Sequence, residues 1–140
     1  MAKNYWLVKT EPYVFSWDKF VKDGRGMWDG VRNYTARNNL RTMKLGELAL
    51  FYHSNEGKEV VGVARVIREH YPDPTAKVGD FSAVDFEPVV PFVVPVTLAA
   101  VKAEPSLADM ALVKRARLSV QPVLPAEFKK ILAMGKTKLP

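Results

Sequence analysis

The sequence predicts an α+β domain in which five or six short strands form a small, curved, mixed β-barrel with helices at its periphery. Three observations predict this fold class. Runs of aromatic and β-branched residues recur at strand length, turns containing Gly or Pro separate them, and segments with helical periodicity lie between them. The 140 residues suit a single domain, and we find neither an internal repeat nor a linker.

The composition favours a compact domain with a polyanionic partner. Apolar residues make up 48% and charged residues 26%, so disordered and low-complexity classes are set aside. Lys and Arg outnumber Asp and Glu by 21 to 15, and the net charge is +6. Cysteine is absent, which excludes disulfides and thiolate metal sites and favours a cytoplasmic location. We expect no membrane insertion, because no run approaches the ~18 to 20 apolar residues needed.

The first elements are short and rich in aromatic residues. Residues 5–10 (YWLVKT) are expected to form a strand that ends at Glu11, because Pro12 pushes its predecessor away from helical geometry. Ser16 is expected to cap a short helix that ends near Gly24. Eight of the fifteen aromatic residues lie in the first 34 positions, so most of them are expected in the core.

The stretch WDGVRNYTARNNL, residues 28–40, organises the chain. Asn33 stands where an N-cap belongs, so a helix is predicted to begin at Tyr34. Helical spacing places Ala36, Leu40 and Met43 on one side and Tyr34, Arg37, Asn38 and Arg41 on the other. Residues 25–44 carry five basic side chains and one acidic residue, so this segment is strongly basic.

The middle of the chain reads as strands. Residues 47–53 alternate in character and residues 59–69 form a second long run, so a hairpin with a turn at 55–58 is the simplest interpretation. Gly62 is expected to relieve curvature. Further strands are predicted at 82–90 and 93–96. Three prolines, Pro88, Pro91 and Pro95, predict edges or bends in this region.

The last third is expected to be mainly helical. Residues 97–102 and 105–112 are predicted as two short helices. A second basic cluster follows at 114–117. Pro125 is expected to begin the final helix and Gly135 to end it.

No convincing catalytic constellation is found. His53 and Ser54 are the best pair of base and nucleophile, but neighbouring residues on a strand point to opposite faces. His70 has no obvious partner. The two histidines and the scattered carboxylates lack the spacing of metal ligands, so neither a metal nor a cofactor is expected.

A binding interpretation finds more support in the residues. Aromatic rings and hydrogen-bonding side chains hold a base that has left its stack, while Arg and Lys hold the flanking phosphates. Trp28 lies beside an arginine-lined helix start, Thr10 lies at a strand end, and Asn33 or Asn38 can donate and accept. The structural alternative stays open at each position: Asn33 as a cap, Thr10 as a strand end and Trp28 as core.

Five strings in order along the chain resemble the EVE domain family: YWLVKTEP (5–12), WDGVRNYTARNNLRTMKLGE (28–47), FYHS (51–54), VVGVARVIREHYPDPTA (60–76) and RLSVQPV (117–123). That family has the PUA-like fold, together with the YTH and ASCH domains. The resemblance implies a small β-barrel with flanking helices and a pocket for a modified base. The implied partner is DNA or RNA that carries a modified base, with a modified cytosine favoured.

The resemblance also implies site residues. The base pocket is expected to contain Thr10, Trp28, Asn33, Tyr34, Phe81 and Ser119. The expected phosphate-binding residues are Arg32, Arg37, Arg41, Lys114 and Arg115. The sequence departs from the family at Thr10, where serine is usual, at Thr35, where glutamine is frequent, and at Phe81, where tryptophan is common in a longer loop.

Three functions remain open from the sequence. The favoured one is a non-catalytic module that captures a modified base. The second is an enzyme that processes nucleic acid or nucleotides, since a fold does not fix a function. The third is an RNA-associated accessory domain whose basic surface shows little preference for a modification.

Overall fold

The computed structural model describes residues 4–54 and 57–140. Within them, the strands are β1 (Tyr5–Thr10), β2 (Gly26–Trp28), β3 (Leu48–His53), β4 (Glu59–Pro72), β5 (Ser82–Thr97) and β6 (Val120–Val123). The helices are α1 (Trp17–Asp23), α2 (Tyr34–Thr42), α3 (Leu98–Ala103), α4 (Ala111–Lys114) and α5 (Pro125–Met134), with a 3-10 turn, η1 (Pro105–Leu107), between α3 and α4. The α+β class is confirmed.

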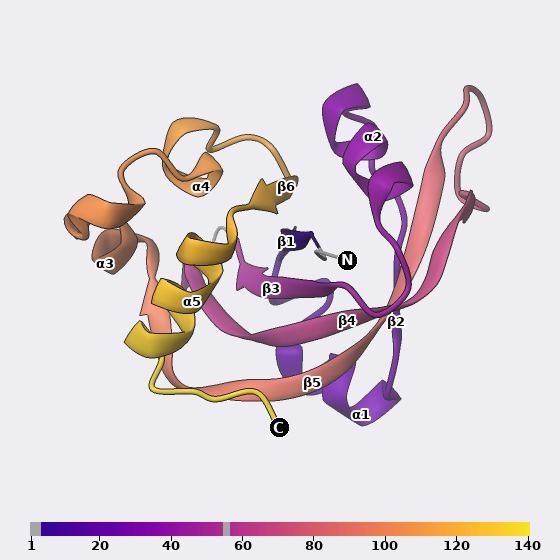
Figure 1. Ribbon diagram of the computed structural model, residues 1–140. Coiled ribbons are helices and arrows are strands. Elements are labelled where there is room, and N and C mark those ends of the chain that lie inside the picture. Colours follow the sequence, from indigo (N-terminus) through magenta and orange to yellow (C-terminus); the bar gives the residue numbers. More distant parts are fainter. Residues whose placement is uncertain (1–3, 55–56) are drawn as a thin grey trace.

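The strands form one mixed sheet in the order β2-β5-β4-β3-β1-β6. The β1–β3 pair is parallel and the other pairs are antiparallel. Strands β4 and β5 are long and bent, so the sheet curves around the molecule like part of a barrel (Figure 1). In the described chain, the end strands β2 and β6 do not pair with each other, which leaves this barrel open.

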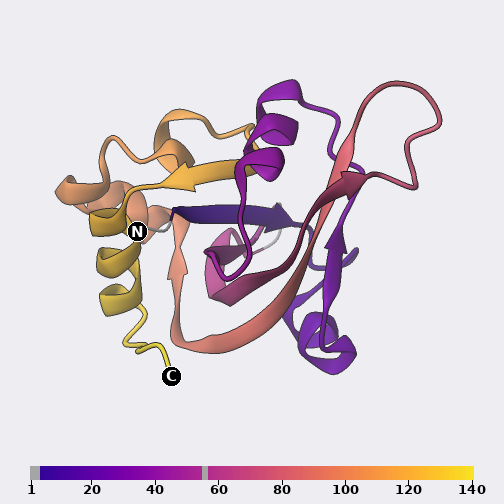
Figure 2. The same cartoon turned by 45° about the vertical axis from the view of Figure 1, so that its right-hand side comes forward.

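Apolar side chains on the two faces of the sheet form two cores. In β1, Trp6 and Val8 belong to one core and Leu7 to the other, and in β3 Phe51 and Leu50 divide in the same way. Helices α1 and α2 supply the first core, while α3, α4 and α5 gather over the second (Figure 2). The sheet therefore buries both of its faces.

Several expected elements are confirmed with their capping chemistry. Strand β1 has the predicted bounds. The Ser16 side chain accepts from the backbone N–H of Lys19 at the start of α1, and Gly24 ends that helix with φ of +77°. Asn33 caps α2, and its oxygen lies 3.0 Å from the backbone nitrogen of Ala36. The predicted apolar side of α2 is fully buried.

Strand β2 was not predicted from the sequence, because three residues are too few to show a strand periodicity. Residues 26–28 pair antiparallel with β5. The Phe15 ring packs closely on this strand, and a Cβ on Gly26 would lie 2.8 Å from it. A side chain at this position would displace the aromatic core, so glycine serves close packing here.

The two strands predicted at 82–90 and 93–96 are one continuous strand, β5. Its prolines are tolerated because β2 pairs only with Val84–Phe86, so the later part of β5 has β4 on one side alone. Register shifts between β4 and β5 supply the expected bends. The helix predicted at 105–112 is divided into η1 and α4.

Gly62 lies in β4 beside a register shift, as a role in curvature would require. It also receives the Trp17 ring, since a Cβ on Gly62 would lie 2.5 Å from a ring carbon. The sequence alone did not reveal this second reason for glycine. The turn predicted at 55–58 lies partly outside the described residues.

Candidate functional site

A pocket of about 660 Å³ opens where the ends of β1 and β3 meet the segment between β2 and α2. It is lined by Lys9, Thr10, Glu11, Val14, Phe15, Met27, Trp28, Asp29, Gly30, Val31, Arg32, Ser54, Ala116, Arg117 and Ser119. Parallel pairing explains why distant residues converge here, because it aligns Thr10 with His53 at the same edge of the sheet. The Ser54 backbone N–H then donates to the Thr10 carbonyl at 2.8 Å.

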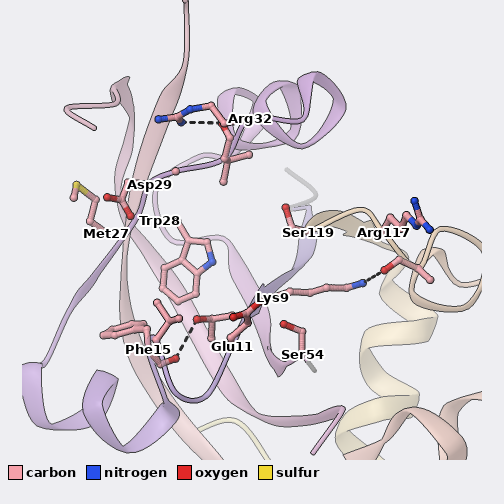
Figure 3. A pocket seen from close by; sticks show the side chains of 15 residues that line it. Lys9, Glu11, Phe15, Met27, Trp28, Asp29, Arg32, Ser54, Arg117 and Ser119 are labelled. Carbon is pink, nitrogen blue, oxygen red and sulfur yellow. Dashed lines mark hydrogen bonds between the residues drawn. The ribbon is translucent and has the colours of Figure 1, made fainter. Parts of the chain in front are cut away.

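Trp28 belongs both to the core and to this pocket. Its side chain is largely buried, and Phe15, Phe51 and Phe86 contact it edge-to-face with centroids 5.1 to 5.7 Å away. The indole lies among the lining side chains in Figure 3. No hydrogen bond from a described residue engages its N–H, and this nitrogen is not among the fully buried polar atoms. A ligand can therefore use it as a donor.

Asp73, in the connection between β4 and β5, holds Gly30 and Arg32 at the rim of the pocket. Its carboxylate is fully buried and accepts from the Gly30 backbone N–H at 2.8 Å and from Arg32 at 3.0 Å. It also accepts from the backbone and hydroxyl of Thr75, each at 2.7 Å. Burial alone would raise the pKa of Asp73, but the hydrogen bonds from Thr75, Gly30 and Arg32 outweigh it and lower the pKa to about 2.

The expected phosphate-binding arginines near α2 make internal contacts. Arg32 reaches Asp73, and its guanidinium carbon lies 4.8 Å from the Phe81 ring centroid. Arg37 donates to the Asp80 carbonyl at 3.0 Å, and Arg41 pairs with the Asp80 carboxylate at 2.7 Å. These three side chains hold the β4–β5 connection against the rest of the domain.

Tyr34 and Phe81 lie outside the pocket. Their rings stack on each other with centroids 6.0 Å apart, and Arg37 lies over the Tyr34 ring. The amide oxygen of Asn33 is used in capping α2, and that residue lines a neighbouring depression. Of the six expected base-pocket residues, the structure thus brings Thr10, Trp28 and Ser119 together and places Asn33, Tyr34 and Phe81 elsewhere.

The neighbouring depression is the more basic one. It measures about 320 Å³ and is lined by Asn33, Lys114, Arg115, Ala116, Arg117 and Leu118. Lys114 lies 3.9 Å from the Asp109 carboxylate. In the described chain, no ion pair or hydrogen bond engages the side chains of Arg115 and Arg117, and both are exposed. Ala116 and Arg117 also line the larger pocket, so the two depressions adjoin each other.

Lys9, Ser54 and Arg117 line the pocket, although none of them was predicted as a pocket residue from the sequence. The Lys9 side chain extends toward the segment 116–117, and its Nζ donates to the Ala116 carbonyl at 2.6 Å (Figure 3). Lys9 and Ser54 could have been found by their position, because each adjoins the end of a predicted strand. Arg117 could have been found by its place in the second basic cluster. The hydroxyl of Thr10 donates to the Phe15 carbonyl at 3.1 Å, so it shapes the loop that borders the pocket.

The proposed base of the enzyme interpretation is already engaged. His53 Nε2 accepts a hydrogen bond from the Trp17 backbone N–H at 3.1 Å, so it does not contact Ser54 as a proton acceptor. Burial lowers the pKa of His53, while Glu59 and Asp18 oppose this effect. Within residues 4–54 and 57–140, no cluster of His, Asp and Glu is placed to hold a metal ion. No helix there is long and apolar enough to span a bilayer.

Comparison with known proteins places this geometry among relatives. The chain is 36% identical to mouse thymocyte nuclear protein 1, covering 96% of the chain and 75% of that protein. The structure of Rpa0253 from Rhodopseudomonas palustris matches with 56% identity and a TM-score of 0.90, covering 95% of this chain and 93% of that one. Human THYN1 protein in complex with 5-methylcytosine containing DNA matches with 33% identity and a TM-score of 0.89, with coverages of 97% and 99%.

A more distant protein has a similar fold. The YTH domain of the Zygosaccharomyces rouxii MRB1 protein superposes with a TM-score of 0.61 at 18% identity, which indicates a shared architecture. The family model that matches this sequence is the EVE domain, and it spans residues 4–134, nearly the whole chain. With the relatives above, this match shows that the chain belongs to the EVE domain family.

Proposed function

We propose that this chain binds nucleic acid and takes a modified base, a modified cytosine, out of its stack into the 660 Å³ pocket. The observation that carries the proposal is the position of Trp28, an aromatic ring that lines an open pocket beside unpaired arginines. The volume lies within the range of about 300 to 1,000 Å³ in which proteins bind small ligands. The complex of human THYN1 protein with 5-methylcytosine containing DNA supports the choice of ligand.

The lining residues suit the edges of a base. The Trp28 ring offers stacking and its N–H a donor, while the hydroxyls of Ser54 and Ser119 can both donate and accept. The Thr10 hydroxyl donates its proton to a backbone carbonyl, so toward a base its oxygen can only accept, while its methyl group can contact an added substituent on the base. A methyl group contributes little area, so a small apolar contact is enough to distinguish a modified cytosine.

Phosphate contacts are assigned to the segment 114–117 rather than to α2. The side chains of Arg115 and Arg117 have no partner in the described chain, whereas those of Arg32, Arg37 and Arg41 are held by the β4–β5 connection. An arginine that already pairs with a carboxylate must give up that contact before it binds a phosphate. The unpaired side chains meet the nucleic acid at lower cost.

The test is a titration of the protein with matched oligonucleotides, single- and double-stranded, whose one central cytosine is unmodified, methylated or hydroxymethylated. We expect the protein to prefer a modified form. Trp28→Ala should weaken binding by roughly 1 to 3 kcal/mol, the usual contribution of one stacked base, whereas Trp28→Phe should retain most of it.

Circular dichroism and thermal unfolding establish that both variants remain folded. Equal affinity for all three cytosines would reject the modified base and favour an accessory domain that recognises only charge. Unchanged affinity in folded Trp28→Ala would remove the ring from the site. Turnover of the oligonucleotides would instead favour the enzyme.

A further inference from the structure

A second, smaller pocket of about 190 Å³ borders the main one. The two share Lys9, Ser54 and Ala116, so a ligand in one lies directly beside the other. The remaining polar groups that line the small pocket come from Tyr52 and Lys58. None of the described residues that line it is acidic, so its charge is positive.

Lys9 is the central group of this pocket. Its Nζ lies 2.6 Å from the Ala116 carbonyl and 5.6 Å from the Tyr52 ring centroid, both of which line the small pocket. An ammonium group has three donors, and the carbonyl uses one of them. Burial lowers the pKa of Lys9, and no carboxylate in the described chain forms an ion pair with it. An anion placed here would stabilise its charged form.

The other groups are also available to an anion. The side-chain hydroxyls of Tyr52 and Ser54 have no hydrogen-bond partner in the described chain, and neither is a fully buried polar atom. The Lys58 side chain is exposed and unpaired there, while its carbonyl accepts from the Leu98 backbone N–H at 2.8 Å. This bond fixes the Lys58 backbone beside the junction of β5 and α3, and from there the residue lines the small pocket.

We propose that the small pocket binds a phosphate group of the ligand whose base occupies the main pocket, an inference that rests on the proposed function. Two ammonium groups and two hydroxyls match an oxyanion, which accepts several charge-assisted hydrogen bonds at once. The shared wall at Lys9 and Ser54 sets the base and the phosphate side by side. The phosphate belongs either to a nucleic-acid backbone or to a free nucleotide.

The first experiment compares affinities for one modified base presented as a nucleoside, as its 5′- and 3′-monophosphates, and as the middle residue of a trinucleotide. At least one phosphorylated form should bind the wild type about tenfold more tightly than the nucleoside. Lys58→Gln should remove most of this gain and leave nucleoside affinity unchanged. Lys129→Gln, which removes an exposed lysine on α5, should keep the gain.

The ligands also separate the two sources of phosphate. A gain with a monophosphate supports a nucleotide phosphate, and a gain confined to the trinucleotide supports a backbone diester. The inference is overturned if no phosphorylated form binds more tightly than the nucleoside, if the gain survives in Lys58→Gln, or if Lys129→Gln loses it equally.

A second experiment uses inorganic phosphate alone and does not depend on base binding. Titration at constant ionic strength should shift the backbone amide resonances of Ser54 and Lys58 in wild type, and much less in Lys58→Gln. If oligonucleotides fail to bind but these shifts occur, the proposed function fails and the phosphate site remains. If phosphate produces no saturable shift at these residues, the site is rejected even when base binding succeeds.

Discussion

Replacing Asp73 with asparagine should destabilise the domain, because it removes a buried carboxylate. Asp73 does not line the pocket, so the effect concerns folding and not ligand contact. The Asp73 carboxylate accepts two hydrogen bonds on each of its oxygens, from Gly30, Arg32 and Thr75. An asparagine has one oxygen and one NH₂ group, so it presents donors to two of these donors. The variant therefore loses an ion pair and leaves buried N–H groups without an acceptor.

The pKa of Asp73 gives the magnitude. It is about 2 in the folded protein against an ordinary value of 3.8, a difference that corresponds to about 2 kcal/mol of unfolding free energy. The folded pKa is the lower one, so this stabilisation is complete above the unfolded pKa, near 4. It is lost as the pH falls from about 4 to about 2. Asp73→Asn should therefore lose about 2 kcal/mol at pH 7 and much less at pH 2.

Urea unfolding of both proteins between pH 2 and pH 7 measures this difference. The matched control is Asp80→Asn, which removes an exposed carboxylate from its pair with Arg41 and should cost at most about 1 kcal/mol. Two results would refute the reasoning: a loss at pH 7 no larger than that of the control, or a difference between wild type and Asp73→Asn that stays constant with pH.

Three further perturbations test the packing and the pocket. Gly62→Ala should destabilise the domain by about 1 to 3 kcal/mol in urea unfolding, because its methyl would press on the Trp17 ring; an unchanged midpoint would contradict this contact. Thr10→Val should cost about 0.5 to 1.5 kcal/mol of unfolding free energy by losing a hydrogen bond, whereas Thr10→Ser should not. Equal losses in the two variants would show that this hydrogen bond does not stabilise the domain. Arg117→Ala should lower the salt dependence of oligonucleotide binding by roughly one phosphate contact and Arg41→Ala should not; the opposite order would place the phosphates on α2.

Local signals predicted the elements they control. Strand β1 and helix α2 have the expected starts, because a run of branched and aromatic residues and an Asn33 cap act within a few residues. Strand β2 was missed because three residues show no periodicity and are defined by pairing with β5. The single strand at 82–97 was divided because prolines near a sheet edge look the same in sequence as prolines that end a strand.

The site was predictable only where a residue's own position reveals it. Thr10 lies at a predicted strand end and Trp28 precedes a predicted helix, whereas Lys9 and Ser54 join them through a parallel pairing that no local pattern shows. The partners of Tyr34 and Phe81 depend on where the β4–β5 connection folds back. Asp73 left a readable signal, since an aspartate two residues before a threonine favours a turn held by its side chain, but burial of that turn comes from tertiary packing.

Asp73 holds the pocket rim without lining the pocket itself. The residues that contact a ligand are therefore not the same as the residues that determine the shape of the pocket. Gly30 and Arg32 line the pocket, yet their anchor lies in a connection that does not. Insertions or deletions between residues 74 and 80 would move that anchor while every lining side chain stayed the same. Ligand preference in this architecture can therefore drift through a surface loop, and a comparison restricted to pocket residues would not detect it.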